Sequence, residues 1–365
     1  MNKGKHILFI SKGLGLGGAQ KMLVFVANGC ASAGHKVSIL SLRNQESSLM
    51  INENIQICNF NFFSGAGSGL GLLEKTQLIW SLRKYISRNR PDLIVVFLSD
   101  IVRIAVLSTF GLGIPIIASE RADPSQYSKK LLAKYNRAYD KCKAVVFQTE
   151  NAQKSYPVSI RKKSAVIPNP YLPRLVDIPP YTGNRKRVIV AAGRLEKQKR
   201  FDILIRAFHV VHSKYSDYSL NIYGDGPLKG ELDQLIHSLN LGNAALLKGA
   251  SSDFLAEAYD TAMFVLSSDY EGIPNVLLEA MGIGMPCIST DCEPGGPRML
   301  FDNERRGILV PIESPKQMAD AICRYIEEPA LSEQKGRNAL EVKTQYKAES
   351  ISQEWLQLIN RYLGK

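Results

Sequence analysis

The sequence predicts an α/β protein with two doubly wound domains, each built on a parallel sheet. Short apolar runs alternate with amphipathic helical patterns along the 365 residues, which favours repeated strand–helix–strand units. The chain is too long for one typical hydrophobic core and has a natural length for two domains. A proline-rich, weakly periodic stretch interrupts the alternation. We therefore expect a first domain at 1–170, a linker at 171–185 and a second domain at 186–347.

The apolar runs also give the order of the strands. In the first domain they predict strands near residues 6–10, 36–42, 92–98, 115–119 and 144–148. In the second domain they predict strands near residues 187–192, 219–223, 244–248, 262–266, 286–290 and 307–310. Ligands of such sheets bind beyond the carboxyl ends of the strands, so a cleft between the two domains is the expected active site.

Composition restricts the class of protein. Hydrophobic residues make up 45% of the chain and charged residues 22%, which describes a soluble globular enzyme and not a disordered protein. The best candidate for a membrane span, 104–119, contains glycines and Pro115, so we interpret it as a helix, a turn and a buried strand. The first residues lead directly into a strand without the pattern of a secretory signal, which predicts a cytoplasmic protein.

The six cysteines are scattered, with no C-x-x-C pair, and the five histidines are dispersed. We therefore expect reduced structural thiols and no metal site.

The net charge of +12 predicts an anionic partner without identifying it, since nucleic acid, an acidic leaflet and phosphorylated lipid all qualify. Basic residues concentrate on two helical segments of the first half, near 75–90 and 129–143. In the first segment we expect one apolar face, with Trp80 nearby, formed by Leu72, Leu73, Ile79, Leu82 and Ile86. This helix is either an ordinary solvated helix packed on a sheet or one that faces a leaflet.

The most informative motif has two carboxylates, Glu271 and Glu279, separated by a turn that opens a helix. An apolar run at 262–266 precedes it, which places Glu271 at the carboxyl end of a buried strand. The turn and first helical residues are Gly272, Ile273, Pro274, Asn275, Val276 and Leu277. We expect the amides of 275–277 to be free to bind a phosphate. Carboxylates on either side of an anion site suit a nucleotide sugar, although an isolated pair of this kind is more often solvated surface.

A second motif supplies cations at the same edge of the predicted sheet. Gly193, Arg194 and Lys199 follow the first strand of the second domain. A departing diphosphate needs positive charge there, because developing negative charge is the usual target of catalytic stabilisation. Turns at 224–227 and 293–298 end two further strands, and the second could close on a donor sugar.

A glycine-rich loop at 13–18 follows the first strand and satisfies G-x-G-x-x-G, a pattern typical of dinucleotide sites. The second strand ends in Arg43 and not in an acidic residue, so a phosphorylated cofactor is an alternative. The same glycines equally suit close approach to another ligand or a plain tight turn.

Together these motifs resemble those of retaining glycosyltransferases of family 4, which have the two-domain GT-B fold. The resemblance covers essentially the whole chain and is strongest in the second domain. It implies that Arg194 and Lys199 bind the donor diphosphate, Glu279 the ribose and Glu271 the donor sugar. The implied catalytic residues are Glu271, Arg194 and Lys199. The implied donor-binding residues are Gly17, Gly18, Gly193, Arg194, Lys199, Gly224, Lys248, Gly272, Ile273, Pro274, Asn275, Val276, Leu277 and Glu279.

The chain departs from the family pattern at one position, where many members carry a histidine after the strand at 115–119. Here the sequence continues with Glu120 and Arg121, which become candidate acceptor or donor contacts. The family also implies that a last helix, 348–365, returns to the first domain.

The resemblance implies a metal-independent enzyme without a cofactor that moves a hexose or N-acetylhexosamine, most often from a UDP-sugar, to a lipid-linked saccharide. Such reactions build capsule, O-antigen or exopolysaccharide at the cytoplasmic face of the inner membrane, where anionic lipid and not nucleic acid is the expected partner. Acceptor choice is expected to depend on first-domain loops such as 64–71. Two alternatives remain: an NADP-dependent oxidoreductase, and a non-catalytic basic adaptor for membrane or nucleic acid.

Overall fold

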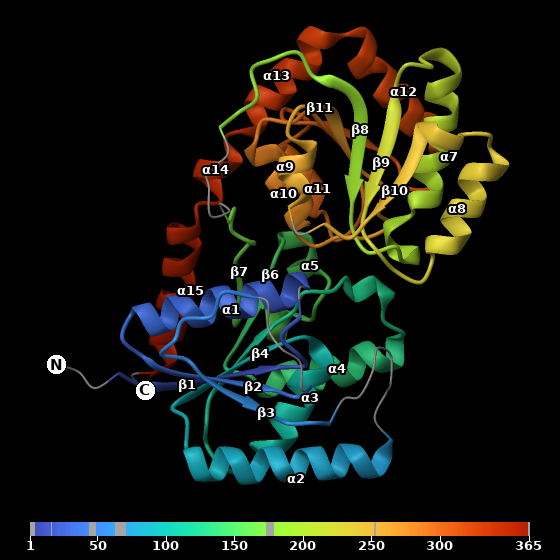
Figure 1. Cartoon of the computed structure of the whole chain (residues 1–365). Coiled ribbons are helices and arrows are strands. Elements are labelled where there is room, and N and C mark those ends of the chain that lie inside the picture. The colour runs from blue at the N-terminus through green and yellow to red at the C-terminus, as the bar shows by residue number, and fades with distance from the viewer. Residues whose placement is uncertain are drawn as a thin grey trace. The chain divides into compact units, whose positions relative to one another are not determined.

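The computed structural model describes residues 4–15, 17–43, 49–62, 71–172, 179–251 and 253–363 (Figure 1). The chain divides into two compact units: unit 1 is Met1–Asn169 with Glu349–Lys365, and unit 2 is Pro170–Ala348. Residues 173–178 of the expected linker and 64–70 of the expected acceptor loop lie outside the described residues. Within the described part of the chain, no helix combines the length and apolarity needed to cross a membrane.

Unit 1 contains a seven-stranded parallel sheet with the order β3-β2-β1-β4-β5-β6-β7. Its strands are β1 (His6–Ser11), β2 (Lys36–Ser41), β3 (Gln56–Asn59), β4 (Leu93–Phe97), β5 (Ile116–Ser119), β6 (Ala144–Phe147) and β7 (Ser164–Val166). The sequence predicted all of these except β3 and β7. These two strands form the edges of the sheet and are half-buried or exposed, so they lack the apolar run that marks a central parallel strand.

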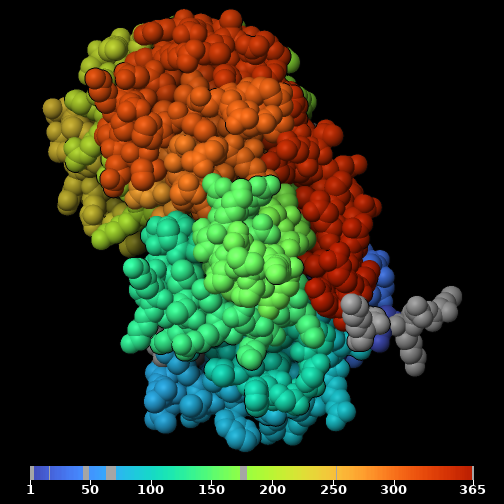
Figure 2. Space-filling model, turned by 180° about the vertical axis from the view of Figure 1, so that it is seen from behind, coloured from blue at the N-terminus to red at the C-terminus, as the bar shows by residue number. Residues whose placement is uncertain are grey.

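Helices cover both faces of this sheet. The helices of unit 1 are α1 (Gly18–Ser32), α2 (Leu72–Asn89), α3 (Ser99–Ser108), α4 (Lys129–Lys141), α5 (Glu150–Lys154), α6 (Val158–Arg161) and α15 (Ala348–Leu363). One core packs α1 and α15 on the sheet, and the other packs α2, α3 and α4 on its opposite face. Figure 2 shows the red C-terminal segment against the green and blue surface of unit 1.

The orientation of α2 corrects one expectation. Its buried face consists of Leu78, Leu82 and Ile86, whereas Leu72 and Leu73 are 81% and 78% exposed. Leu72 and Leu73 belong to the first turn of the helix, and Leu73 lies opposite the buried row by the 3.6-residue period. The predicted apolar face therefore combined residues from two sides of the helix.

Unit 2 contains a six-stranded parallel sheet with the order β10-β9-β8-β11-β12-β13. Its strands are β8 (Lys186–Ala192), β9 (Ser219–Tyr223), β10 (Ala245–Gly249), β11 (Thr261–Leu266), β12 (Cys287–Thr290) and β13 (Ile308–Val310), all predicted from the sequence. One core packs α7 (Phe201–Lys214), α8 (Lys229–Ser238) and α12 (Pro315–Glu327) on the sheet. The other face carries α9 (Phe254–Ala258), α10 (Asn275–Gly282), α11 (Gly296–Phe301) and α14 (Val342–Gln345), and α13 (Pro329–Ala339) follows α12. This order makes β8 and β11 neighbours.

The packing of α15 predicts a test of unit 1. Trp355 is 1% exposed and stacks on Phe97 of β4 with ring centroids 5.8 Å apart. Replacing it with alanine removes the largest side chain of this core, so Trp355→Ala should lower the free energy of unfolding of unit 1 by about 3–5 kcal/mol. Trp80, the other tryptophan, is 74% exposed, so Trp80→Ala should stay within about 0.5 kcal/mol of the parent. Urea denaturation followed by circular dichroism measures both; equal losses would contradict the packing.

Candidate functional site

The candidate site of unit 2 is built from the loops that follow β8 and β11. Because these parallel strands are adjacent, their carboxyl ends place Arg194 and Lys199 next to Glu271 at one edge of the sheet. The sequence predicted this proximity, and the structure gives its geometry.

Glycines let the loops after β8 and β9 pack backbone against backbone. Gly224 has φ 144°, and a Cβ atom there would lie 1.8 Å from the carbonyl oxygen of Gly193. A Cβ atom on Gly193 would itself lie 3.1 Å from Cε of Lys199. Larger residues at either position would displace the lysine from the sheet edge.

The loop at 197–200 is hydrogen-bonded along its length to the loop at 267–271. Ser267 Oγ donates to the carbonyl of Lys199 at 2.6 Å. The amide of Asp269 donates to the carbonyl of Gln198 at 2.9 Å. Gln198 Nε2 in turn donates to the carbonyl of Tyr270 at 2.8 Å. These hydrogen bonds therefore join the two loops into one rigid segment around the site.

Arg200 fixes the outer side of the two joined loops. Its Nη1 atom lies 3.2 Å from the carboxylate of Asp269 and 2.9 Å from Glu313, and its Nε donates to Asp202 at 3.1 Å. The hydrogen bond to Asp202, more than those to Glu313 and Asp269, raises the pKa of the guanidinium, so Arg200 stays charged. Gln198, Arg200 and Asp269 were not predicted as site residues, although each is adjacent or close in sequence to a predicted one.

The central contact of the site is an ion pair between Lys199 and Glu271. Lys199 Nζ donates to Glu271 Oε1 at 2.5 Å, and the two side chains are only 17% and 10% exposed. Ser268 Oγ donates to the same carboxylate oxygen at 2.7 Å. The attraction between the two charges is stronger than in a surface pair, because little water screens it, but the cost of removing both groups from water offsets part of this gain. Burial, together with the nearby Glu271 carboxylate, raises the pKa of the Cys292 thiol to about 12.

Arg194 differs from Lys199 in being available to solvent. Its side chain is 74% exposed and contacts only the Glu196 carboxylate, at 3.0 Å, among the ion pairs described for it. An exposed guanidinium pair of this type is weak and opens easily. The two predicted cations therefore differ, since Lys199 is held in a partly buried ion pair and Arg194 is open to solvent.

The second glutamate of the motif lies on α10, which Pro274 caps. The amide of Leu277 donates to the carbonyl of Pro274 at 3.1 Å, so this amide, expected to be free for a phosphate, is engaged within the helix. Glu279 is half-buried on the same helix, between buried Leu278 and Ala280.

The turn before α10 is packed from its other side by α11. A Cβ atom on Gly296 would lie 1.4 Å from the carbonyl oxygen of Gly272, so only glycine fits there. Next to it, Ile273 is buried at 4% exposure and Val276 is half-buried. Arg298 pairs with Asp291 at 2.8 Å and Glu293 at 3.5 Å, which holds the turn that was expected to close on the donor sugar.

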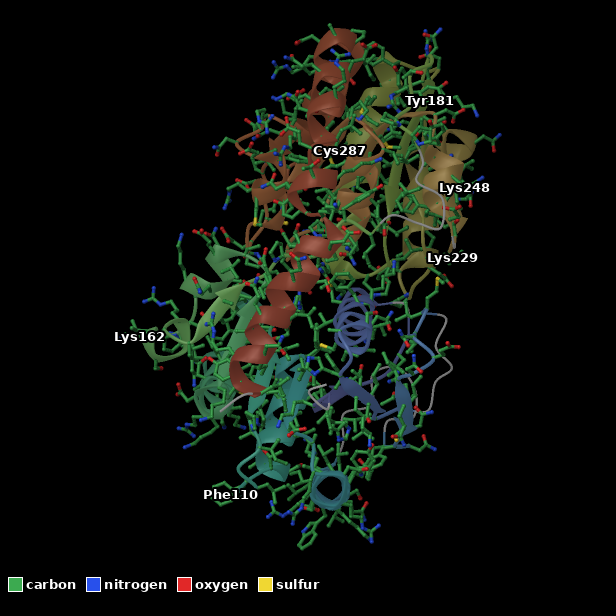
Figure 3. All side chains as sticks on the ribbon, turned by 90° about the vertical axis from the view of Figure 1, so that its left-hand side faces the viewer. Phe110, Lys162, Tyr181, Lys229, Lys248 and Cys287 are labelled. Carbon is green, nitrogen blue, oxygen red and sulfur yellow. The ribbon has the colours of Figure 1, made fainter. Side chains whose placement is uncertain are left out.

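Lys248, a predicted donor-binding residue of unit 2, lies three strands away from β11. It lies on β10, the edge strand, and is exposed at the margin of unit 2 (Figure 3). Three strand spacings separate β10 from β11, or roughly 14 Å at about 4.8 Å each. Within the described residues, no group of three or more histidine, cysteine, aspartate or glutamate side chains is arranged to hold a metal ion.

Unit 1 presents its own residues at the carboxyl edge of its sheet. Gly17 and Gly18 are exposed at the start of α1, directly beyond β1, as predicted. Leu98, directly after β4, has φ 75°, a strained conformation for leucine that often marks a functional site. No residue pattern around Leu98 predicted this strain.

Glu120 is the hub of a buried hydrogen-bond network. Only 2% exposed, its Oε2 accepts hydrogen bonds from the hydroxyls of Tyr139 at 2.7 Å, Tyr156 at 2.9 Å and Ser99 at 2.5 Å. Its Oε1 accepts from the backbone amides of residues 121 and 122 at 2.8 and 3.0 Å. This carboxylate is therefore held within unit 1 by five donors and shapes the loop that carries Arg121.

Arg121 projects from that loop into partly buried surroundings. Its guanidinium lies 5.1 Å from the ring centroid of Phe97 and 5.8 Å from that of Trp355, and Nη1 donates to Asn169 at 2.9 Å. Burial, partly offset by Glu120, lowers the pKa of Arg121 to about 9, which leaves it positively charged at neutral pH. Its Nη2 atom is buried without a hydrogen-bond partner.

The network predicts that Glu120→Gln destabilises unit 1. The amide group would set an N–H donor against hydroxyl or amide donors, so the free energy of unfolding should fall by about 1–3 kcal/mol. Glu53→Gln, an exposed control in the same unit, should change it by less than about 0.5 kcal/mol. Both tryptophans belong to unit 1, so denaturation followed by tryptophan fluorescence reports on this unit. A Glu120→Gln protein as stable as the control would contradict the network.

Comparisons with known proteins agree on one family. Residues 16–175 match the family model described as Glycosyltransferase Family 4, and residues 180–342 match the one described as Glycosyl transferases group 1. A Campylobacter jejuni α-1,4-N-acetyl-D-galactosaminyltransferase, named for a saccharide acceptor on PP-undecaprenol, is 24% identical over 364 residues, 97% of this chain and 98% of its own.

Solved structures share the fold over nearly the whole chain. Sucrose-phosphate synthase from Thermosynechococcus elongatus superposes with a TM-score of 0.84 at 17% identity, over 99% of both chains. Anabaena HepE in complex with UDP superposes with a TM-score of 0.77 at 17% identity, over 98% of this chain and 100% of its own. Together, the two family models and the two parallel-sheet units of the GT-B fold show that this chain belongs to the family 4 glycosyltransferases.

Proposed function

We propose that this glycosyltransferase moves a hexose or N-acetylhexosamine from a UDP-sugar to a lipid-linked saccharide during assembly of a bacterial surface polysaccharide. The observation that carries the proposal is the Lys199–Glu271 ion pair beside the exposed Arg194. The UDP in HepE and the PP-undecaprenol acceptor of the Campylobacter relative support the two substrate classes. Capsule, O-antigen and exopolysaccharide are all compatible products.

The charges of the site suit the two halves of such a donor. Lys199 and Arg194 supply positive charge for the diphosphate, and Glu271 accepts hydrogen bonds from hydroxyls of the transferred sugar. Glu279, on the helix that follows, accepts from the ribose hydroxyls. Because Glu271 already neutralises Lys199, the incoming diphosphate has to share this lysine, and Arg194 supplies the additional charge.

The proposed reaction retains the configuration of the transferred sugar. The acceptor oxygen forms a bond to the anomeric carbon on the face from which the diphosphate departs. The electron pair of the broken carbon–oxygen bond goes to the leaving phosphate oxygen, and a phosphate oxygen takes the acceptor's proton. Lys199 and Arg194 stabilise the charge that develops, so this scheme requires neither a metal ion nor a cofactor.

Unit 1 supplies the candidate acceptor residues. Gly17 and Gly18 expose the start of α1 to a phosphate, and Arg121 offers a buried guanidinium nitrogen without a partner. Glu120 acts indirectly, by shaping the Arg121 loop. A lipid-linked acceptor requires work at a membrane, so we place the protein at the cytoplasmic face of the inner membrane.

The cation roles predict the effect of single substitutions. Arg194→Ala and Lys199→Ala should each lower turnover by roughly a hundredfold, because each removes a preorganised stabiliser of the leaving diphosphate. Lys197→Ala is the matched control, since Lys197 is exposed in the same turn, and its rate should stay within about threefold of the parent. Steady-state transfer assays with a UDP-sugar test this. Rates near the parent for both site variants would contradict the assignment of this loop to the phosphates.

The two glutamates should separate ribose binding from sugar transfer. Glu279→Gln should weaken binding of free UDP by about tenfold or more, since it weakens a charged hydrogen bond to the ribose. Glu271→Gln should leave UDP affinity unchanged or increase it, because it frees Lys199 for the diphosphate, while turnover falls.

Titration calorimetry with UDP measures both affinities, with Glu231→Gln on the exposed surface of α8 as the control. A loss of UDP affinity confined to Glu271→Gln would show that the donor lies in the reverse orientation.

A further inference from the structure

The outer face of α2 is the row of exposed side chains that points away from the core of unit 1. It consists of Leu73, Gln77, Trp80, Lys84 and Arg88, all exposed and spaced by three or four residues, so they lie along one side of the helix. The buried row of α2 lies on the opposite side. Within the part of unit 1 that the structure describes, the outer face therefore stays open to solvent.

Large apolar side chains project from the first half of this face. Leu73 is 78% exposed and Trp80 74%, and Leu72 beside them is 81% exposed. Seven residues of helix separate Leu73 from Trp80, or about 10 Å at 1.5 Å per residue. Such exposure leaves apolar area in water, which costs free energy unless another surface covers it.

The end of α3 extends this apolar surface. Arg83 Nη1 donates to the carbonyls of Ser108 at 3.2 Å and Phe110 at 2.7 Å, which ties the end of α3 to α2. Phe110 is 80% exposed and projects beside α2, which is seen end-on in Figure 3. The apolar side chains thus come from two segments, and the hydrogen bonds of Arg83 hold these segments together.

Exposed basic residues lie on α2 itself and on α4. Lys84 and Arg88 continue the outer face itself, directly after Trp80. Next to α3, which packs between α2 and α4, the exposed basic residues of α4 are Lys129, Lys130, Lys134, Arg137 and Lys141. The acidic Glu74 of α2 is engaged at the start of the helix, where its carboxylate accepts from the Gly71 amide at 2.7 Å.

We propose that the outer face of α2, with Phe110, docks on an anionic bilayer and inserts Trp80, Leu73 and Phe110 into its interface. The surface combines an indole and aliphatic side chains with flanking lysine and arginine, which matches a layer of apolar chains beneath anionic headgroups. The outer face carries two basic residues and no acidic one, so its charge complements anionic headgroups. The inference rests on the proposed function for its membrane, but it assigns the anchoring face, which that function leaves open.

The two tryptophans make the insertion directly measurable. Trp80 is exposed and Trp355 is buried, so only Trp80 can meet lipid without unfolding. With vesicles of phosphatidylglycerol and phosphatidylethanolamine whose acyl chains carry bromine, the parent protein should lose about the Trp80 share of its emission. Trp80→Phe should bind the same vesicles with little quenching. Parent protein that binds without any quenching would overturn the insertion of Trp80.

Variants of the surface should separate its apolar and charged contributions. Trp80→Ala should weaken vesicle co-sedimentation about tenfold, and Lys84→Glu with Arg88→Glu about twentyfold or more. Two controls match these changes: Val158→Ala, an exposed apolar residue on α6, and Lys162→Glu with Lys229→Glu, which alters the net charge equally at exposed residues outside α2 (Figure 3). If the two double charge variants lost vesicle binding equally, binding would depend on net charge alone. The assignment of the outer face of α2 as the docking surface would then be wrong.

Two further results would overturn the membrane-docking proposal without bearing on the proposed glycosyltransferase activity. Equal binding to phosphatidylcholine vesicles and anionic vesicles at low salt would remove the charge argument. Concentration-dependent dimerisation, lost in Trp80→Ala, would assign the surface to a second copy of the chain. UDP binding measured on the same variants distinguishes a failure of membrane docking from a failure of the proposed function. UDP affinity should be unchanged in all of these variants. Absence of UDP binding in the parent protein would contradict the proposed function instead.

Discussion

The Lys199–Glu271 ion pair links the loops that follow β8 and β11, and the charge of the candidate site depends on it. The pair is possible because β8 and β11 are neighbours in a parallel sheet, although more than seventy residues separate the two side chains in sequence. The backbone bonds between 197–200 and 267–271 then fix the distance at which lysine and glutamate meet. Because Lys199 and Glu271 already neutralise each other, a ligand that binds there has to compete with their ion pair. Selectivity then arises from how well the charges and hydroxyls of the ligand replace that contact.

Two buried glutamates, Glu120 and Glu271, show how environment decides the role of a carboxylate. Glu271 faces one cation and one hydroxyl, and its second oxygen, Oε2, has no hydrogen bond described in the structure. Glu120 receives five donors on its two oxygens and has little remaining capacity for a ligand. The first is suited to contact a substrate, and the second is suited to hold a loop in place.

Sequence patterns anticipated the central strands and the residues at their carboxyl ends, because buried parallel strands are apolar runs and site residues follow them directly. The edge strands β3 and β7 escaped because they are half-exposed and carry no such run. The glycine-rich loop at 13–18 suggested an oxidoreductase, which is wrong for a chain of a glycosyltransferase family, since a tight turn into a helix serves many phosphate ligands. The Glu120 network joins residues 99, 120, 139 and 156, and the positive φ of Leu98 depends on tertiary packing, so neither leaves a local pattern.

The return of α15 to unit 1 has a consequence for how the chain acquires its structure. Unit 2 is an insertion within unit 1, since the core around Phe97 is completed only by Trp355 near the other end of the sequence. During synthesis, all of unit 2 emerges before unit 1 can close. One face of the sheet of unit 1 therefore stays uncovered until α15 is made. Unit 2, which follows that sheet in the sequence, can fold before it is covered.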